Sequence, residues 1–417
     1  MAPAHLLDLT RLVSRLGRAA LTGVDRVELA WAERLLEGEA CEGIPLFALV
    51  RTAWGFCLLD RRGVEKVLAV THGAALGKAD LLGRISRRNA PLRARAEALA
   101  RRESVMRCTV PGLARMLRRL PSGTTYFNMG HANLTPRVMA AQRGPRVVLI
   151  HDTIPLDHPE FTRPGVPQVF ARKLAAATHA DLIVHTAQAT RVLTEAQMAR
   201  FGPLPAGVVA PLGVGLPAAG GFDLPGLDRN RPFFVTVGTI EPRKNHALLL
   251  DVWEALAARH APEAMPQLVT AGSRGWLNRA VFARLDARPP HVIEAPGLSD
   301  PALAGLLQAS QGLLFPTLAE GFGLPPLEAA GLGVPLIVSD LPVLRETLGD
   351  LAVYLSPTDV YSWMETIERA ADGRHGWGEG VRGQATTGGR RAVPDWTTHF
   401  NTVLNFLRQT GPQDRTR

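Results

Sequence analysis

Short apolar runs alternate with helix-like stretches along almost the whole chain, and this alternation limits the folds that the sequence allows. The runs carry few polar residues, as strands do when both faces of a sheet are covered. Helical stretches separate most of them, which is the pattern of parallel sheets with helices on both faces. The sequence therefore predicts an α/β protein whose ligands bind beyond the carboxyl ends of the strands. The strand-like runs are LLDLT, PLFALVRT, TTYFNM, RVVLIHD, DLIVHT, FFVTVGT, QLVTAGS, VIEAPG, GLLFPT and PLIVSD.

Proline and glycine crowd together between residues 213 and 232, where the apolar periodicity is weak. At 417 residues the chain is long for one core, and it suits two domains of about 200 residues each. We therefore predict two Rossmann-like domains with a cleft between them. The predicted divisions are an N-terminal domain at 1–215, a linker at 216–231, a C-terminal domain at 232–393, a C-terminal helix at 394–409 that packs back on the first domain, and a disordered tail at 410–417.

The segment at 313–330, LLFPTLAEGFGLPPLEAA, places Glu320 and Glu328 on either side of a glycine- and proline-marked turn. Pro325 and Pro326 suit the first positions of a helix, so the turn joins a strand to a helix. The N–H groups of a helix start favour phosphate, whereas carboxylates accept hydrogen bonds from hydroxyls. A nucleotide sugar has both needs. The alternative is an ordinary strand–helix turn with two acids, which is common in α/β proteins.

A second constellation, VGTIEPRKNH at 237–246, follows the first strand of the C-terminal domain. Gly238 and Thr239 turn the chain, and Arg243 and Lys244 then present two cations before a helix. Paired cations at this place would stabilise the charge that develops on a departing diphosphate. The alternative is a solvent-facing pair at a helix start.

The chain carries a net charge of +9, and much of the excess lies between Arg84 and Arg119. Apolar residues recur there at helical spacing, including Val105 and Met106, which predicts one or two basic amphipathic helices able to lie on an anionic membrane surface. A solvated basic face is the alternative. No helix-turn-helix, zinc-finger or RNA-binding signature accompanies the charge, so we expect no nucleic-acid partner.

The sequence favours a cytoplasmic protein. Cys41, Cys57 and Cys108 lack metal-ligand or redox spacing and are expected to be reduced thiols. No apolar stretch approaches the ~18 residues of a membrane span, and the N-terminus lacks the pattern of a signal peptide.

The motifs E-P-R-K-N at 241–245, A-G-S-R-G-W at 271–276, P-G-L-S-D at 296–300 and E-G-F-G-L-P-P-L-E-A at 320–329 together resemble the retaining glycosyltransferases of family 4, which have the GT-B fold. The resemblance covers nearly all of residues 233–357. L-T-G-V-D-R-V-E and I-H-D-T-I-P-L-D, in the N-terminal half, are similar to that family more loosely.

The resemblance implies an N-terminal acceptor-binding domain and a C-terminal nucleotide-sugar-binding domain. Glu328 would hold the ribose hydroxyls, Glu320 would contact the donor sugar, and Arg243 and Lys244 would bind the diphosphate. Gly23 would let the first N-terminal loop approach the donor. The remaining residues expected to line the sugar and phosphates are Gly321, Phe322, Gly323, Leu324, Gly238 and Thr239.

His151 and Asp152 follow a strand of the N-terminal half and are expected to face the cleft. His151 joins Glu320, Arg243 and Lys244 as a candidate catalytic residue. Asp152 is a candidate to orient the acceptor hydroxyl, although it could equally cap the following turn. His131 is a further candidate for the acceptor side. For both histidines the alternative is a structural role.

No cofactor or metal site is predicted, because the D-x-D pair of metal-dependent enzymes is absent from the sequence. The cations and the helix start would balance the diphosphate charge instead. We expect activity to survive excess EDTA.

The resemblance implies transfer of a hexose from a nucleotide sugar to an acceptor hydroxyl with retention of configuration. Bacterial surface-polysaccharide mannosyltransferases often carry the E-P-R-K-N motif, which favours GDP-mannose, with a UDP-sugar still open. The acceptor would be a glycan, either free or linked to polyprenyl diphosphate at the inner face of the membrane. The alternatives are a GT-B-type epimerase or phosphorylase and a non-catalytic nucleotide-sugar-binding protein.

Overall fold

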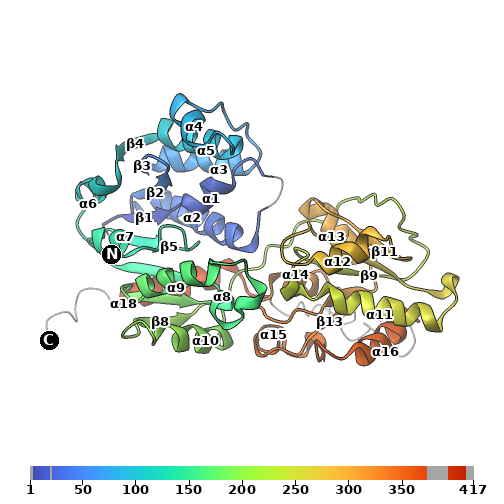
Figure 1. Cartoon of the computed structure of the whole chain (residues 1–417). Helices are drawn as coiled ribbons and strands as arrows, with labels where there is room; N and C mark the ends of the chain where they lie inside the picture. The colour runs from blue at the N-terminus through green and yellow to red at the C-terminus, as the bar shows by residue number, and fades with distance from the viewer. Residues whose placement is uncertain (1–2, 19–20, 373–392, 410–417) are drawn as a thin grey trace.

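The computed structural model describes residues 3–18, 21–372 and 393–409, and these form two α/β domains joined side by side (Figure 1). The sequence prediction of two α/β domains with largely parallel sheets is therefore confirmed. The predicted tail at 410–417 lies outside the described residues, as does the stretch at 373–392.

An eight-stranded sheet forms the centre of the N-terminal domain. Its central strands are buried along their whole length, because helices cover both faces. All neighbouring strands run parallel except in the β2–β3 and β3–β4 pairs, which are antiparallel. The strand order is β4 (Ser104–Cys108), β3 (Gly55–Leu59), β2 (Leu46–Thr52), β1 (His5–Asp8), β5 (Thr125–Asn128), β6 (Arg146–Ile150), β7 (Leu182–His185) and β8 (Ala206–Val209).

Ten α-helices and two short 3-10 helices accompany this sheet in the described residues. They are α1 (Thr10–Arg15), α2 (Gly23–Glu42), α3 (Arg61–Thr71), α4 (Leu81–Ser86), α5 (Pro91–Arg102), η1 (Val110–Gly112), α6 (Leu113–Leu117), α7 (Pro136–Ala141), α8 (Ile154–Asp157), η2 (Pro159–Phe161), α9 (Val166–Ala177) and α10 (Gln188–Met198).

A six-stranded, wholly parallel sheet forms the centre of the C-terminal domain. Its order is β11 (Val292–Glu294), β10 (Gln267–Ala271), β9 (Phe233–Val237), β12 (Gly312–Phe315), β13 (Leu336–Ser339) and β14 (Ala352–Leu355). The chain moves outward from β9 in one direction, then returns to β12 and moves outward in the other. Such a reversal leaves a crevice at the carboxyl ends of β9 and β12, where ligands bind in doubly wound folds.

The helices of the C-terminal domain come between these strands. They are η3 (Pro242–Lys244), α11 (His246–Arg259), η4 (Pro262–Ala264), α12 (Arg279–Asp286), α13 (Asp300–Ala309), α14 (Leu324–Gly331), α15 (Pro342–Leu348), η5 (Gly349–Leu351) and α16 (Val360–Ala371).

The C-terminal helix α18 (Trp396–Gln409) returns to the N-terminal domain and contacts β8. Its buried residues Phe400 and Val403, with half-buried Trp396, recur at helical spacing and form its apolar face. The ring of Phe400 lies 5.1 Å from that of Trp31 on α2. Helix α18 thus helps to cover the sheet of the first domain.

The prediction of basic amphipathic helices across residues 84–119 is partly wrong. Val105 and Met106 lie in β4, an edge strand that pairs antiparallel with β3. Several arginines of this segment are not free to meet a membrane, because Arg87 and Arg93 pair with the buried Glu97 and Arg101 pairs with Asp80. None of the described helices is long and apolar enough to cross a membrane.

The two domains contact each other through hydrogen bonds as well as apolar packing. The hydroxyls of Thr186 and Thr190 donate to the backbone oxygen of Gly321, at 3.1 and 2.6 Å. The carboxylate of Glu346 on α15 accepts from the N–H groups of Gln188 and Ala189 at the start of α10. The loop after β12 is therefore held against the first domain.

His399 makes the docking of α18 sensitive to pH. The indole N–H of Trp31 donates to its Nε2 at 3.1 Å, so the ring proton is on Nδ1, which lies 3.0 Å from the backbone oxygen of Ala210. Burial lowers the pKa of His399 to about 4. The pKa of His399 is lower in the folded state than in the unfolded state. The contribution of neutral His399 to the stability is therefore fully present above pH 6.5 and is lost as the pH falls towards 4.

We therefore expect His399→Gln, which can still accept from Trp31, to remove this loss. Between pH 7 and 4.5 the free energy of unfolding of the wild type should fall by roughly 2 kcal/mol relative to that of the variant. Calorimetric melting at both pH values measures the difference, with exposed His179→Gln as the matched control. If wild type and His399→Gln differ in stability by the same amount at the two pH values, His399 is not the residue that makes the docking of α18 sensitive to pH.

Candidate functional site

The two loops that follow β9 and β12 meet at the crevice of the C-terminal sheet. The hydroxyl of Thr317 and the N–H of Leu318 both donate to the backbone oxygen of Arg243, at 3.1 and 2.8 Å. The loop after β9 is therefore attached to the loop after β12 before any side-chain charge is considered. This attachment sets the distance between the predicted cations and the predicted acids.

An ion cluster joins the charged residues of the two loops. A single oxygen of Glu320, Oε2, lies 2.6 Å from Nζ of Lys244 and 3.0 Å from a guanidinium nitrogen of Arg243. Arg243 also pairs with Glu241 at 2.9 Å and donates to the backbone oxygen of Ala319. The structure thus brings together three of the four residues predicted to be catalytic.

The cluster lies largely out of solvent, so its electrostatics are strong. Burial alone would raise the pKa of Glu320, but the attraction of Lys244 and Arg243 lowers it to about 2. Burial lowers the pKa of Lys244, with Glu320 opposing the shift. For Arg243, Glu320 and Glu241 outweigh burial and raise the pKa. Glu320 is therefore a carboxylate at neutral pH and a weak base.

The start of α14 offers fewer donors than the sequence predicted. Pro325 and Pro326 occupy its first turn, and proline has no N–H. The N–H of Leu327 already bonds to the oxygen of Gly323. Gly323 has φ of +94°, which brings the chain sharply into the helix. The backbone N–H donors at this turn are therefore those of Gly323 and Leu324. The side chain of Phe322 is buried in the core.

Glu328 faces the N-terminal domain and pairs with it. Its Oε1 lies 2.7 Å from Arg26 in the first turn of α2, and Arg26 also contacts Asp300 at 2.8 Å. A Cβ on Gly23, at the start of the same helix, would lie 3.2 Å from the side chain of Leu324. The structure therefore places Gly23 and Glu328 on facing walls of the cleft.

His151 and Asp152 follow β6 and lie against the loop after β12. A Cβ on Gly321 would lie 2.6 Å from the backbone oxygen of His151 and 3.0 Å from Cβ of Asp152, so glycine is required there. Nε2 of His151 lies 2.7 Å from the backbone oxygen of Met129. Burial lowers the pKa of His151 to about 4 and raises that of Asp152. His151 is thus neutral, with one nitrogen committed to the backbone.

His131 lies behind His151 and is not among the residues that line the cavity described next. Their rings are 5.1 Å apart, and Nε2 of His131 bonds to the backbone oxygen of Leu149 at 2.8 Å. Burial lowers its pKa well below the usual value. Its contacts favour the structural alternative over direct contact with an acceptor.

Gly238 and Thr239 serve the two loops in different ways. Gly238 has φ of +141°, and a Cβ there would lie 3.4 Å from the Lys244 side chain, so this glycine leaves room for the lysine stem. Thr239 lies against Gly275 in the loop after β10, where a Cβ would meet its methyl group. Thr239 therefore packs against that loop.

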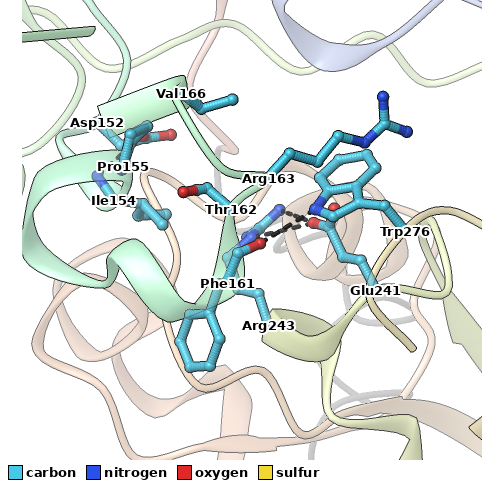
Figure 2. Close-up of a pocket in the computed structure, with 10 residues that line it drawn as sticks. All are labelled: Asp152, Ile154, Pro155, Phe161, Thr162, Arg163, Val166, Glu241, Arg243 and Trp276. Carbon is cyan, nitrogen blue, oxygen red and sulfur yellow. Dashed lines mark hydrogen bonds and ion pairs between the residues drawn. The ribbon is translucent and has the colours of Figure 1, made fainter. Parts of the chain in front are cut away.

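A cavity of about 420 Å³ opens between the domains beside the ion cluster (Figure 2). The N-terminal domain contributes Asp152 and the stretch from α8 to the start of α9. The C-terminal domain contributes the loop after β9 and Trp276. The lining residues are Asp152, Ile154, Pro155, Phe161, Thr162, Arg163, Val166, Glu241, Arg243 and Trp276.

Sequence reasoning did not assign a role to four of the residues in and around this cleft. Glu241 stands inside the E-P-R-K-N motif and Trp276 ends A-G-S-R-G-W, so both carried a signal at strand ends. Arg26 follows the predicted Gly23 by one helical turn. Phe161 had no sequence signal, because it contributes its backbone oxygen to Trp276 across the domain boundary.

Removing one partner from the buried Glu320 cluster should be costly. Glu320→Gln leaves Lys244 and Arg243 without their shared charge in a buried place, and we expect a loss of about 3 kcal/mol. Glu365→Gln, which breaks the exposed pair with Arg259, should leave the stability almost unchanged, because water and salt screen an exposed pair. Chemical denaturation of both variants measures the contrast.

The pH dependence checks the same assignment. The pKa of Glu320 is lowered in the folded state, so its contribution is present above pH 4.5 and disappears as the pH falls towards 2. The difference in the free energy of unfolding between wild type and Glu320→Gln should therefore be constant near neutral pH and should become smaller below pH 4.5. If this difference becomes larger as the pH falls, Glu320 is not held as a carboxylate by Lys244 and Arg243.

The chain is similar to known proteins in sequence and in fold. Residues 223–379 match the family described as glycosyl transferases group 1. A serotype-specific mannosyltransferase, WbdA of Escherichia coli, is 30% identical over 251 residues, which cover 54% of this chain and 30% of that protein. The chain thus spans under a third of the length of the first curated relatives that it matches.

Solved structures share the two-domain architecture. HepE of Anabaena, in complex with UDP, has a TM-score of 0.61 at 13% identity, over 97% of this chain and 99% of that one. WaaG, a glycosyltransferase of lipopolysaccharide biosynthesis, has a TM-score of 0.57 at 14% identity, over 95% and 98%. These neighbours are GT-B glycosyltransferases, so the GT-B fold predicted from the sequence is confirmed.

Proposed function

We propose that this chain transfers a hexose from a nucleotide-diphosphate sugar to a hydroxyl of a glycan acceptor, in line with the match of residues 223–379 to the glycosyl transferases group 1 family. The observation that carries the proposal is the Glu320 cluster. Two cations and a carboxylate stand at the crevice of a doubly wound sheet, next to a cavity that reaches the other domain. A diphosphate needs cations there, and a sugar needs hydrogen-bond acceptors.

In this proposal the donor replaces contacts that the protein makes with itself. Lys244 and Arg243 share the oxygen of Glu320, and the diphosphate would take the place of that oxygen. Glu320 would then accept hydrogen bonds from the sugar. Glu328 pairs with Arg26, and the ribose hydroxyls would compete for the same carboxylate. The N–H groups of Gly323 and Leu324 would add donors to the phosphates.

The chemistry follows from the proton affinities of these groups. Without a donor, Lys244 and Arg243 lower the pKa of Glu320 to about 2, so this carboxylate is a weak base in the free protein. We therefore propose transfer with retention, in which the departing phosphate takes the proton of the acceptor hydroxyl. Lys244 and Arg243 would stabilise the charge on that phosphate. Asp152 would orient the acceptor hydroxyl, and no metal ion would take part.

The donor sugar is proposed to be mannose, carried by GDP. The support is the similarity to the mannosyltransferase WbdA of E. coli, together with the E-P-R-K-N motif. HepE was solved with UDP, so a UDP-sugar is the alternative. The cytoplasmic location predicted from the sequence stays a prediction.

Nucleotide binding tests the proposal first. GDP-mannose, UDP-glucose and ADP-glucose are compared by thermal shift, and the true donor at a hundredfold excess over Kd should raise the melting temperature by about 5 °C. Glu328→Gln should weaken binding at least about tenfold through the lost ribose contact. Asp300→Asn is the matched control, because it also loses a contact of Arg26 but should leave donor affinity unchanged.

Product analysis completes that test. Release of nucleoside diphosphate that depends on an added glycan acceptor supports a transferase. Conversion of the sugar without an acceptor would favour an epimerase, and binding without any product would favour a binding protein. A melting temperature unmoved by all three donors would contradict the proposal.

We propose that α4 and the neighbouring turn between β2 and β3 form the surface of the protein that contacts a membrane. Leu81, Ile85 and Trp54 are 72%, 62% and 47% exposed, and Trp54 lies against α4, because its indole N–H donates to the backbone oxygen of Leu82. Arg84 on the same helix is also exposed. Apolar side chains beside arginine suit the surface of an anionic bilayer. This places the proposed contact at one end of the predicted basic segment.

Flotation with liposomes tests this surface. The wild type should float with vesicles that contain an anionic lipid and should float less with neutral vesicles. Leu81→Ser with Ile85→Ser should abolish flotation. Val192→Ser with Leu193→Ser is the matched control, because these side chains on α10 are also exposed, at 59% and 52%. Equal flotation of both double variants would contradict the role of α4.

A further inference from the structure

We infer that the cavity between the domains binds a neutral hexopyranose ring of the acceptor, with Trp276 as its platform. The inference rests on the proposed function, and it adds the chemical class of the acceptor. The cavity of about 420 Å³ has the size of a small-molecule site. It is built by both domains, as Figure 2 shows for Asp152 on one side and Trp276 on the other.

The cavity lies beside the place where the donor sugar would react. Arg243 lines it, and the guanidinium of Arg243 is 3.0 Å from Glu320. Asp152 also lines it and lies against Gly321 in the loop after β12. An acceptor hydroxyl must come within ~3.5 Å of the anomeric carbon. A ring in this cavity would border the residues assigned to the donor sugar, as such an approach requires.

Much of the wall is apolar and partly aromatic. Trp276, Phe161, Ile154, Pro155 and Val166 contribute carbon surface. The face of an aromatic ring carries partial negative charge, so it attracts the weakly positive C–H groups of a pyranose. Sugar rings offer such C–H groups on one face and hydroxyls around the edge, which matches a wall of this kind.

Glu241 supplies an acceptor for the hydroxyl groups. Its side chain is 5% exposed, and Oε1 pairs with Arg243 at 2.9 Å. The other oxygen, Oε2, has no hydrogen-bond partner within the described part of the chain and is buried. A buried carboxylate oxygen without a partner is costly. A sugar hydroxyl would satisfy it.

The charges of the wall favour a neutral ring over a phosphorylated one. With the nucleotide bound, Arg243 would be committed to Glu241 and the diphosphate. The carboxylates of Glu241 and Asp152 would repel a phosphate group. Arg163 is the remaining cation of the wall, and its guanidinium lies over the ring of Trp276, 5.3 Å from the centroid.

Trp276 also joins the two domains at this cavity. Its indole N–H donates to the backbone oxygen of Phe161 at 3.0 Å. The bond holds a C-terminal-domain ring against the N-terminal-domain stretch between α8 and α9. Ring contact and domain contact are therefore separable by substitution: Trp276→Phe removes the bond and keeps an aromatic face, whereas Trp276→Leu removes both.

Ligand-observed NMR tests the inference directly. Methyl α-mannopyranoside, methyl α-glucopyranoside and mannose 6-phosphate are added to the full chain saturated with GDP or UDP. At least one neutral glycoside should receive saturation and bind at least about tenfold more tightly than the phosphate ester. Trp276→Leu should weaken it tenfold or more, as expected for a lost buried contact, and Trp276→Phe should weaken it less. Tyr361→Leu, at an aromatic ring on α16 that is 62% exposed, should have no effect.

The outcomes separate this inference from the proposed function. Nucleotide binding with no glycoside binding overturns the inference alone. Stronger binding of mannose 6-phosphate, or equal glycoside binding by Trp276→Leu, does the same. Failure of every nucleotide to bind overturns the proposed function and the inference with it.

Discussion

The candidate site depends on one carboxylate oxygen that two cations share. Oε2 of Glu320 holds Lys244 and Arg243, and through Arg243 the cluster extends to Glu241. Taking these charges out of water is expensive, so the cluster is weak evidence for stability as such. Its value is positional, because it fixes two cations beside the crevice before a donor arrives. The backbone bonds from Thr317 and Leu318 to Arg243 hold the same arrangement.

A second ion pair lies at the other end of the proposed donor-binding site. Arg26 reaches across the cleft to Glu328, the carboxylate proposed for the ribose. Both proposed sugar-binding acids are therefore paired with the protein's own cations. A donor would exchange these ion pairs for its phosphates and hydroxyls, so its net affinity is the difference between two sets of contacts. Thr186 and Thr190 hold the domains together at Gly321, next to Glu320, and Glu346 does so at the start of α10.

Much of the fold was predictable from the sequence, because buried parallel strands are continuous apolar runs with helices between them. The antiparallel strands β3 and β4 were missed. β4 is an edge strand with exposed Val105 and an arginine, so its pattern was taken for a basic helix. Only its pairing with β3 decides otherwise.

The site was predictable where motifs follow strand ends, as for Glu320, Arg243 and Lys244. It was not predictable where two domains meet. The pairing of Arg26 with Glu328 joins residues 302 positions apart, and no local pattern announces it. The sparse donors at α14 were visible in Pro325 and Pro326, whose missing N–H groups limit a phosphate seat. His131 shows the opposite case, since its position after a strand suggested the cleft but its ring packs behind His151.

Hydrogen–deuterium exchange with and without a nucleotide sugar tests the central claim most directly, namely that the donor binds between the Glu320 cluster and the facing domain. The account predicts slower exchange in three stretches that are far apart in sequence: 237–246, 317–331 and 21–27. Protection at all three would place the ligand at both walls of the cleft. Protection confined to other parts of the chain, or none at saturating donor, would contradict the account.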